Sequence, residues 1–200
     1  MYPKIIRKLI FLWKNPRIIV IKDEEIIKVV SHLLKRYFTV GILKEKIPDM
    51  FNIIKNKILI FNQKNEDFSF LFKNSRQPVL VIKEIENNEE FIKLIKDLPD
   101  RAYLVLNFDN PEVRNLKKET VSNILTFGFY EGADIRATDI NSGNEMVNFK
   151  LNYEGGFIPV WLKASSEMEE KETIYSTLIV ASIGTIVGLN LVEISQSLKS

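Results

Sequence analysis

Short runs of apolar, mostly β-branched residues alternate with helix-like patterns through the first half of the sequence. The runs lie at residues 17–21, 38–40, 57–61, 78–82 and 102–106. Between them, segments 23–36 and 88–98 carry apolar residues at helical spacing. This alternation predicts an α/β fold, in which a mostly parallel sheet is flanked by helices on both faces.

After Pro111 the pattern changes to consecutive strands, expected at residues 124–127, 134–138, 146–151 and 157–162. Two closing helices follow at 170–187 and 191–199, divided by Gly188 as a helix stop and Asn190 as an N-cap. We therefore predict one unit over residues 1–200. It consists of an α/β part (1–113), a small antiparallel β-meander (114–165) and closing helices (166–200).

The charged residues and the scarcity of metal-binding side chains exclude several classes of protein. The 200 residues include 28 Lys and Arg against 26 Asp and Glu, a net charge of +2 that argues against a dedicated nucleic-acid binder. Without cysteine, the chain has no disulfide scaffold or thiolate zinc site. A single histidine, His32, argues against a histidine metal site. We expect no metal site and a cytoplasmic location.

Two segments raise the question of a membrane. Residues 2–13 are basic and apolar, and a helix there would carry two faces. One face holds Ile5, Ile6, Leu9, Leu12 and Trp13, and the other holds Lys4, Arg7 and Lys8. We favour a surface helix that caps the fold, with a helix on a membrane surface as the alternative.

The second segment, 174–192, lacks charge over roughly 19 residues, close to the length that spans a bilayer. Its polar residues, with the break at Gly188, favour two packed helices over a tail anchor. We therefore expect no membrane partner.

Three motifs in the second half carry a family resemblance. They are Leu-Val-Leu-Asn-Phe-Asp-Asn-Pro-Glu-Val at 104–113, Ile-Leu-Thr-Phe-Gly at 124–128 and Gly-Ala-Asp-Ile-Arg-Ala at 132–137. With the helix pair at 175–198, they resemble the central domain of the Mur ligases, the ATP-dependent enzymes that extend the peptide of peptidoglycan precursors. The similarity covers residues 102–199 and is greatest to the ligase that adds D-alanyl-D-alanine.

The resemblance implies a P-loop-NTPase-like fold and a nucleotide site. Asn107 and Asp109 match family residues that lie near the adenine and ribose. Both follow a strand's carboxyl end, where open α/β sheets place ligands. A structural alternative stays open: Asn110 caps the helix begun by Pro111, while Asn107 and Asp109 shape the turn.

The first half departs from the family where the chemistry is expected. In the family, the strand corresponding to 17–21 enters a glycine-rich loop that holds the ATP phosphates. Here it enters Lys22-Asp23-Glu24-Glu25, which contains no glycine and three carboxylates. The family's magnesium-binding residues and carbamylated lysine have no clear counterpart, since His32, Lys93 and Lys96 are expected on helices.

These departures predict a bacterial pseudoenzyme with a degenerate P-loop and no catalytic residue. It would be a binding or scaffolding module linked to peptidoglycan precursor synthesis, and it would need no cofactor. Its partner would be another cell-wall ligase chain or a second copy. One alternative is part of a split ligase, completed by a partner chain and using ATP and Mg²⁺. A second alternative is a tail-anchored membrane protein.

Overall fold

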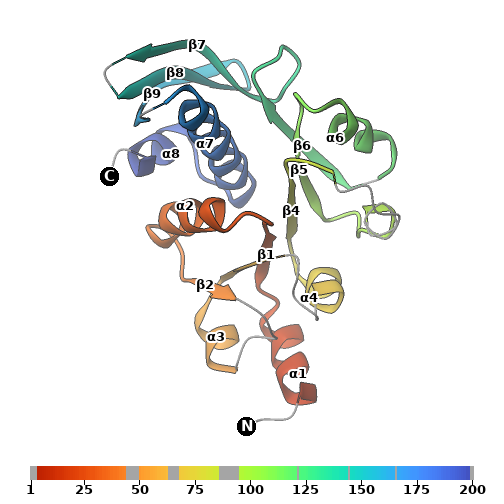
Figure 1. Cartoon of the computed structure of the whole chain (residues 1–200). Coiled ribbons are helices and arrows are strands. Elements are labelled where there is room, and N and C mark those ends of the chain that lie inside the picture. Colours follow the sequence, from red (N-terminus) through yellow and green to blue (C-terminus); the bar gives the residue numbers. More distant parts are fainter. Residues whose placement is uncertain are drawn as a thin grey trace. The chain divides into compact units, whose positions relative to one another are not determined.

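The computed structural model describes residues 4–43, 50–62, 68–85, 95–120, 122–143, 145–164 and 166–198. The chain forms two compact units, whose elements are labelled in Figure 1. Unit 1 comprises Met1–Ile82, Glu86–Leu104 and Lys118–Asn123. Unit 2 comprises Lys83–Ile85, Val105–Lys117 and Ile124–Ser200.

Unit 1 contains the predicted parallel sheet. Its strands are β1 (Arg17–Val20), β2 (Val40–Leu43), β3 (Ile58–Phe61) and β4 (Pro78–Ile82). They lie in the order β2-β3-β1-β4, and every pair is parallel. The residues of β3 and β4 are buried throughout, as expected for strands covered on both faces.

The helices of unit 1 are α1 (Lys4–Lys14), α2 (Glu24–Lys35), α3 (Met50–Lys55) and α4 (Phe68–Asn74). α2 confirms the helix predicted at 23–36, and it buries Ile26, Val30 and Leu33. α3 and α4 were not predicted, because six or seven residues hold too few apolar positions to establish a period. Most of the helix expected at 88–98 lies outside the described residues.

α1 forms where expected but is turned the opposite way from a helix that caps the fold. Ile5, Leu9 and Trp13, on the apolar face, are 72%, 60% and 75% exposed, whereas a helix that caps the fold would bury them. The buried contact comes instead from Phe11, on the other side of the helix, beside the half-buried Arg7 and Lys8. Periodicity located the apolar face correctly but carries no information about which face meets the protein.

The strands of unit 2 include the second part of β5 (Tyr103–Asn107) and most of β6 (Asn123–Gly128). β7 (Ile135–Gly143), β8 (Met146–Tyr153) and β9 (Gly156–Lys163) follow. β6 pairs with β7 in parallel, whereas β7-β8-β9 are antiparallel. The predicted meander is therefore confined to these last three strands. The α/β class, with antiparallel strands and closing helices at the C-terminal end, is confirmed.

The helices of unit 2 are α6 (Pro111–Asn115), continued by a 3-10 turn (Leu116–Lys118), then α7 (Glu167–Val187) and α8 (Leu191–Leu198). Gly188 ends α7 with a left-handed backbone, at a φ of 99°. Asn190 and Glu193 each accept a bond from the other's backbone N–H, at 3.0 and 2.8 Å, which forms a capping box at α8. The two-helix interpretation is confirmed. Within the described residues, no helix has the length and apolar character to cross a membrane.

Candidate functional site

A cavity of about 860 Å³ lies in unit 2, where several strands end. Lys83 and Glu84 follow β4, Asn107 ends β5, and Phe129 follows β6. Its other lining residues are Asp109, Asn110, Pro111, Glu112, Tyr130, Lys171, Glu172 and Tyr175. The structure thus brings both predicted nucleotide-site residues, Asn107 and Asp109, to one cavity at the carboxyl ends of strands.

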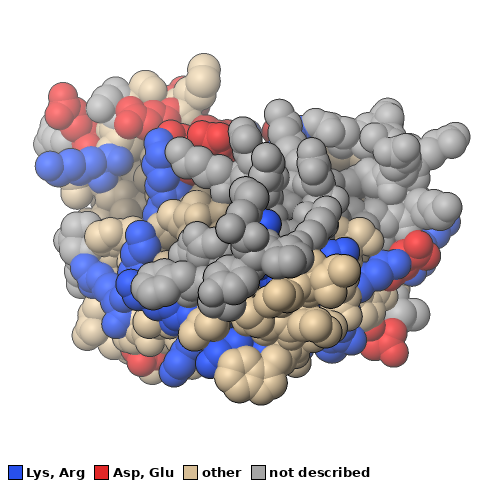
Figure 2. Space-filling view, turned by 90° about the horizontal axis from the view of Figure 1, so that it is seen from below, with Lys and Arg blue, Asp and Glu red and all other residues tan. Residues whose placement is uncertain are grey.

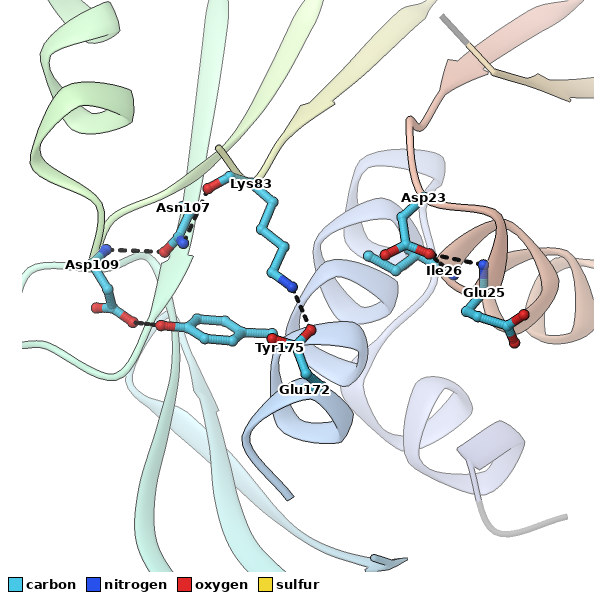
Figure 3. Close-up of polar contacts among 8 residues, drawn as sticks. All are labelled: Asp23, Glu25, Ile26, Lys83, Asn107, Asp109, Glu172 and Tyr175. Atoms are coloured by element: carbon cyan, nitrogen blue, oxygen red, sulfur yellow. Dashed lines mark hydrogen bonds and ion pairs between the residues drawn. The ribbon is translucent and has the colours of Figure 1, made fainter. Parts of the chain in front are cut away.

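Asn107 is 6% exposed and uses its side chain on the backbone around it. Its Nδ2 donates to the carbonyl oxygen of Lys83 at 3.2 Å, and its Oδ1 accepts from the Asp109 N–H at 3.0 Å. Figure 3 shows the amide between these two partners. Asn107 therefore fixes the turn after β5 to the segment after β4.

Asp109 accepts hydrogen bonds from three residues of two other segments. The Phe129 N–H donates to Oδ2 at 2.8 Å, and the Tyr130 N–H donates to Oδ1 at 3.1 Å. The Tyr175 hydroxyl of α7 donates to Oδ2 at 2.9 Å. A Cβ on Gly128 would lie 2.5 Å from Oδ1, so glycine leaves the room that this carboxylate needs. The structural role foreseen as the alternative is present at both Asn107 and Asp109.

Tyr175 is the third member of this network, and it was not predicted. Its side chain is 7% exposed, and its ring meets that of Phe129 edge-on at a centroid distance of 4.8 Å. Burial, then the hydrogen bond to Asp109 and the nearby negative charges, raise the pKa of the Tyr175 hydroxyl well above its ordinary value of 10.0. The hydroxyl therefore stays protonated and donates at neutral pH.

Lys83 is the other site residue that was missed. Its ammonium forms an ion pair with Glu172 of α7 and lies 5.7 Å from the centre of the Tyr175 ring (Figure 3). Lys83 directly follows β4, as Asp109 closely follows β5, so its place at a strand's carboxyl end was the available signal. Tyr175 gave no such signal, because it lies within the apolar sequence of α7.

The cavity lining carries more negative than positive charge. Glu84, Asp109, Glu112 and Glu172 oppose only Lys83 and Lys171. Carboxylate and amide oxygens accept hydrogen bonds, and the carboxylates repel anions. The lining therefore suits a weakly charged ligand that donates hydrogen bonds better than a polyanion. Among the described residues, no group of three His, Asp or Glu side chains is arranged to hold a metal ion.

In unit 1, the turn between β1 and α2 has its own carboxylate cap. Asp23 is the N-cap of α2, and its Oδ1 accepts from the Glu25 and Ile26 N–H groups at 2.8 and 3.2 Å (Figure 3). Glu24 and Glu25 occupy the first turn, where carboxylates suit the helix dipole. Two of the amides that a helix N-terminus offers to an anion are therefore already bonded to a side chain of the protein.

The remaining residues considered from sequence have structural or surface positions. Asn110 caps α6 as predicted, with Oδ1 accepting from Glu112 and Val113. Asp134 binds the Thr126 N–H and hydroxyl at 2.7 and 2.6 Å. His32 is exposed on α2, and Lys96 pairs with Glu119 at 3.0 Å. Lys93 lies outside the described residues.

Sequence comparison matches residues 81–166 to the Mur ligase middle domain. The UDP-N-acetylmuramate–L-alanine ligase of Xanthomonas campestris pv. campestris is 25% identical over 154 residues, covering 71% of this chain and 31% of the relative. The corresponding ligase of Halorhodospira halophila is 26% identical over 110 residues, covering 55% and 22%. The chain thus spans no more than about a third of the length of these relatives.

Structural comparison matches nearly the whole chain. The D-alanyl-D-alanyl-adding ligase of Acinetobacter baumannii aligns with a TM-score of 0.70 at 12% identity, covering 97% of this chain and 47% of that one. The MurF ligase of Thermotoga maritima, solved with ADP, gives 0.66 at 16% identity, covering 94% and 50%. At such identities the likeness shows the fold alone. Residues 81–166 thus match the Mur ligase middle domain in sequence, and the chain shares its fold with the Mur ligases aligned with it.

Proposed function

We propose that this chain is a non-catalytic binding or scaffolding module in peptidoglycan precursor synthesis. The sequence relatives are UDP-N-acetylmuramate–L-alanine ligases, and the structural relatives include MurF ligases. These names connect the chain with cell-wall ligases. The chemistry of its own residues supports a role other than ATP-driven ligation.

The observation that carries the proposal is the Asp23 cap of α2. By resemblance, this turn corresponds to the phosphate loop of the family. Here two of its amides are bonded to a carboxylate of the chain, and two further carboxylates follow in the first helical turn. A triphosphate would have to displace Asp23 and would then lie beside like charge. The sequence has no glycine before Gly41, so the backbone gains no room to wrap around a phosphate.

We propose further that Asn107 and Asp109 are the remnant of a nucleotide site, converted to holding the turn after β5 in place. Most of their hydrogen-bonding capacity is used within the protein. A nucleoside held only by what is left would bind weakly, because phosphate and metal contacts would be missing. The module would therefore act without cofactor, in the cytoplasm, on another cell-wall ligase chain or as a homodimer.

The test is phosphate release from Mg-ATP by the purified chain, with a UDP-muramyl acceptor and L-alanine or D-alanyl-D-alanine. We expect no amino-acid-dependent release above a protein-free blank, while an active Mur ligase in the same assay serves as the positive control. Turnover by the chain alone would contradict the proposal. Turnover that appears only with a copurified partner chain would establish the split ligase instead.

A further inference from the structure

α1 presents an apolar face to solvent. Ile5, Leu9 and Trp13 are 72%, 60% and 75% exposed, and they are joined by Ile6 and Leu12 at 38% and 45%. Their spacing places them on one face of the helix. Scattered exposed apolar residues are ordinary, but five on one short helix form a contiguous surface of the kind that marks an interaction site.

The contacts of α1 hold it in this orientation. Phe11 is fully buried, and its ring lies 6.0 Å from that of Phe70 in α4. The Lys8 ammonium lies 4.5 Å from the centre of the same ring, and α1 also packs against α3. The helix is thus attached to unit 1 through its more polar side, which leaves the apolar face outward.

Cationic residues gather at the end of unit 1 where α1 meets the sheet. α1 ends at Lys14. The N–H of the next residue, Asn15, donates to the Phe11 carbonyl oxygen at 2.8 Å, and β1 begins two residues after Asn15. The Arg17 N–H donates to the carbonyl oxygen of Lys57 at 3.1 Å. Arg17, which begins β1, and Lys57, which precedes β3, are therefore neighbours. We call Lys14, Arg17, Lys57, Arg76 and Arg101 the cationic edge.

Three arginines of the cationic edge share a cavity of about 400 Å³. Arg17, Arg76 and Arg101 line it with Gln77, Tyr103 and Asn123, so none of the described residues in its lining is a carboxylate. Burial, and then the charge of Arg76, lower the pKa of Arg17. Asp100, the acidic residue directly before Arg101 in the sequence, is exposed. Figure 2, which views the molecule from the end where α1 lies in Figure 1, shows several blue Lys and Arg side chains next to tan uncharged residues.

We propose that α1 and the cationic edge dock on an anionic lipid surface. The apolar face would enter the headgroup boundary, and the cations would meet lipid phosphates. At 11 residues, α1 is about 16 Å long and suits the interface plane rather than a span. A second copy would match the apolar face, whereas an anionic lipid surface also offers phosphates to the cations. Lipid complements both features at once.

The experiment is co-sedimentation of the full chain with two kinds of vesicle. One is phosphatidylcholine alone, and the other is phosphatidylcholine with phosphatidylglycerol in about equal amounts. We expect binding to the anionic vesicles that weakens as salt is added, and little binding to the neutral ones. The double variant Leu9→Gln/Trp13→Gln should weaken that binding by about tenfold or more, because both exposed side chains lose apolar area.

The matched control is Met168→Gln/Val192→Gln, which changes two exposed apolar residues on the helices of unit 2, and it should bind like wild type. Trp161→Phe leaves Trp13 as the sole tryptophan, whose emission should shift to shorter wavelength on anionic vesicles. Equal binding by wild type and Leu9→Gln/Trp13→Gln would overturn the proposal. A lipid-free dimer that the same double variant dissociates would also overturn it, since the face would then be a homodimer interface.

Discussion

Asp109 ties three segments of unit 2 together through one carboxylate. It begins the turn after β5 and accepts bonds from the segment after β6 and from α7. The sequence identified Asp109 as important and left open whether it contacts a ligand or shapes the turn. Its partners were beyond prediction, because Tyr175 is 66 positions away and only the tertiary fold brings the two side chains together.

The hydrogen bond between Tyr175 and Asp109 predicts that substitutions of these two residues lower stability in a non-additive way. Tyr175→Phe removes one partly buried hydrogen bond and should lower the free energy of unfolding by about 1 kcal/mol. Tyr130→Phe, which changes a 65% exposed ring, is the matched control and should be neutral. Urea unfolding of wild type, Tyr175→Phe, Asp109→Asn and the double variant should give a coupling of about 0.5–3 kcal/mol. Additive losses would refute the coupling.

The Tyr175 hydroxyl also predicts a pH dependence. Its pKa is raised in the folded state, so at pH values above 10.0 the unfolded chain loses a proton that the folded chain keeps. The stability contribution is therefore complete below about pH 10 and declines as the pH rises further. Ultraviolet titration of the six tyrosines should show one group ionising late, and this group should be missing in Tyr175→Phe. An unchanged titration curve would disprove the assignment.

At the scale of elements, the sequence located β1, β3, β4, β5 and the α7–α8 pair, because buried parallel strands and capped helices leave local signals. It misjudged two features that depend on packing. The pairing of β6 with β7 is parallel, which alternation of apolar residues does not encode. The orientation of α1 is decided by the contact of Phe11 with Phe70, 59 positions along the chain.

The end of α7 offers a test of helix termination. Gly188 has a φ of 99°, which an L side chain adopts only with strain. Gly188→Ala should lower the free energy of unfolding by about 1 kcal/mol or more. Gly143→Ala, at a glycine with no atom within 4 Å of an added Cβ and no positive φ, serves as the control. Equal stabilities of the two variants in thermal unfolding would argue against the left-handed stop.

Two substitutions of Asp23, at the start of α2, distinguish the effect of its capping hydrogen bonds from the effect of its charge. Asp23→Ala should lower the free energy of unfolding by about 1 kcal/mol, because the Glu25 and Ile26 N–H groups lose their acceptor. Asp23→Asn keeps an acceptor oxygen and should cost far less. Urea unfolding monitored by circular dichroism compares the two variants. A large loss in Asp23→Asn would mean that charge, rather than capping, holds this turn.

For the whole molecule, similarity to the Mur ligases does not by itself establish their chemistry. Fold and motifs connect the chain with the Mur ligases over a part of their length. The turn after β1 and the cavity after β5 both use carboxylates in hydrogen bonds within the protein. The sequence showed the three carboxylates after β1, but it did not predict the hydrogen bonds of Asp23. The hydrogen bonds of the cavity needed the structure, because hydrogen bonds between distant segments leave no local pattern.

The most direct test of the account is a calorimetric titration of the purified chain with Mg-ATP and, separately, with AMP. A functional phosphate loop would make ATP bind far more tightly, because the β- and γ-phosphates would supply most of the contacts. With Asp23 in that place, we predict that ATP binds no more tightly than AMP. An affinity for Mg-ATP about tenfold or more above that for AMP would contradict the account.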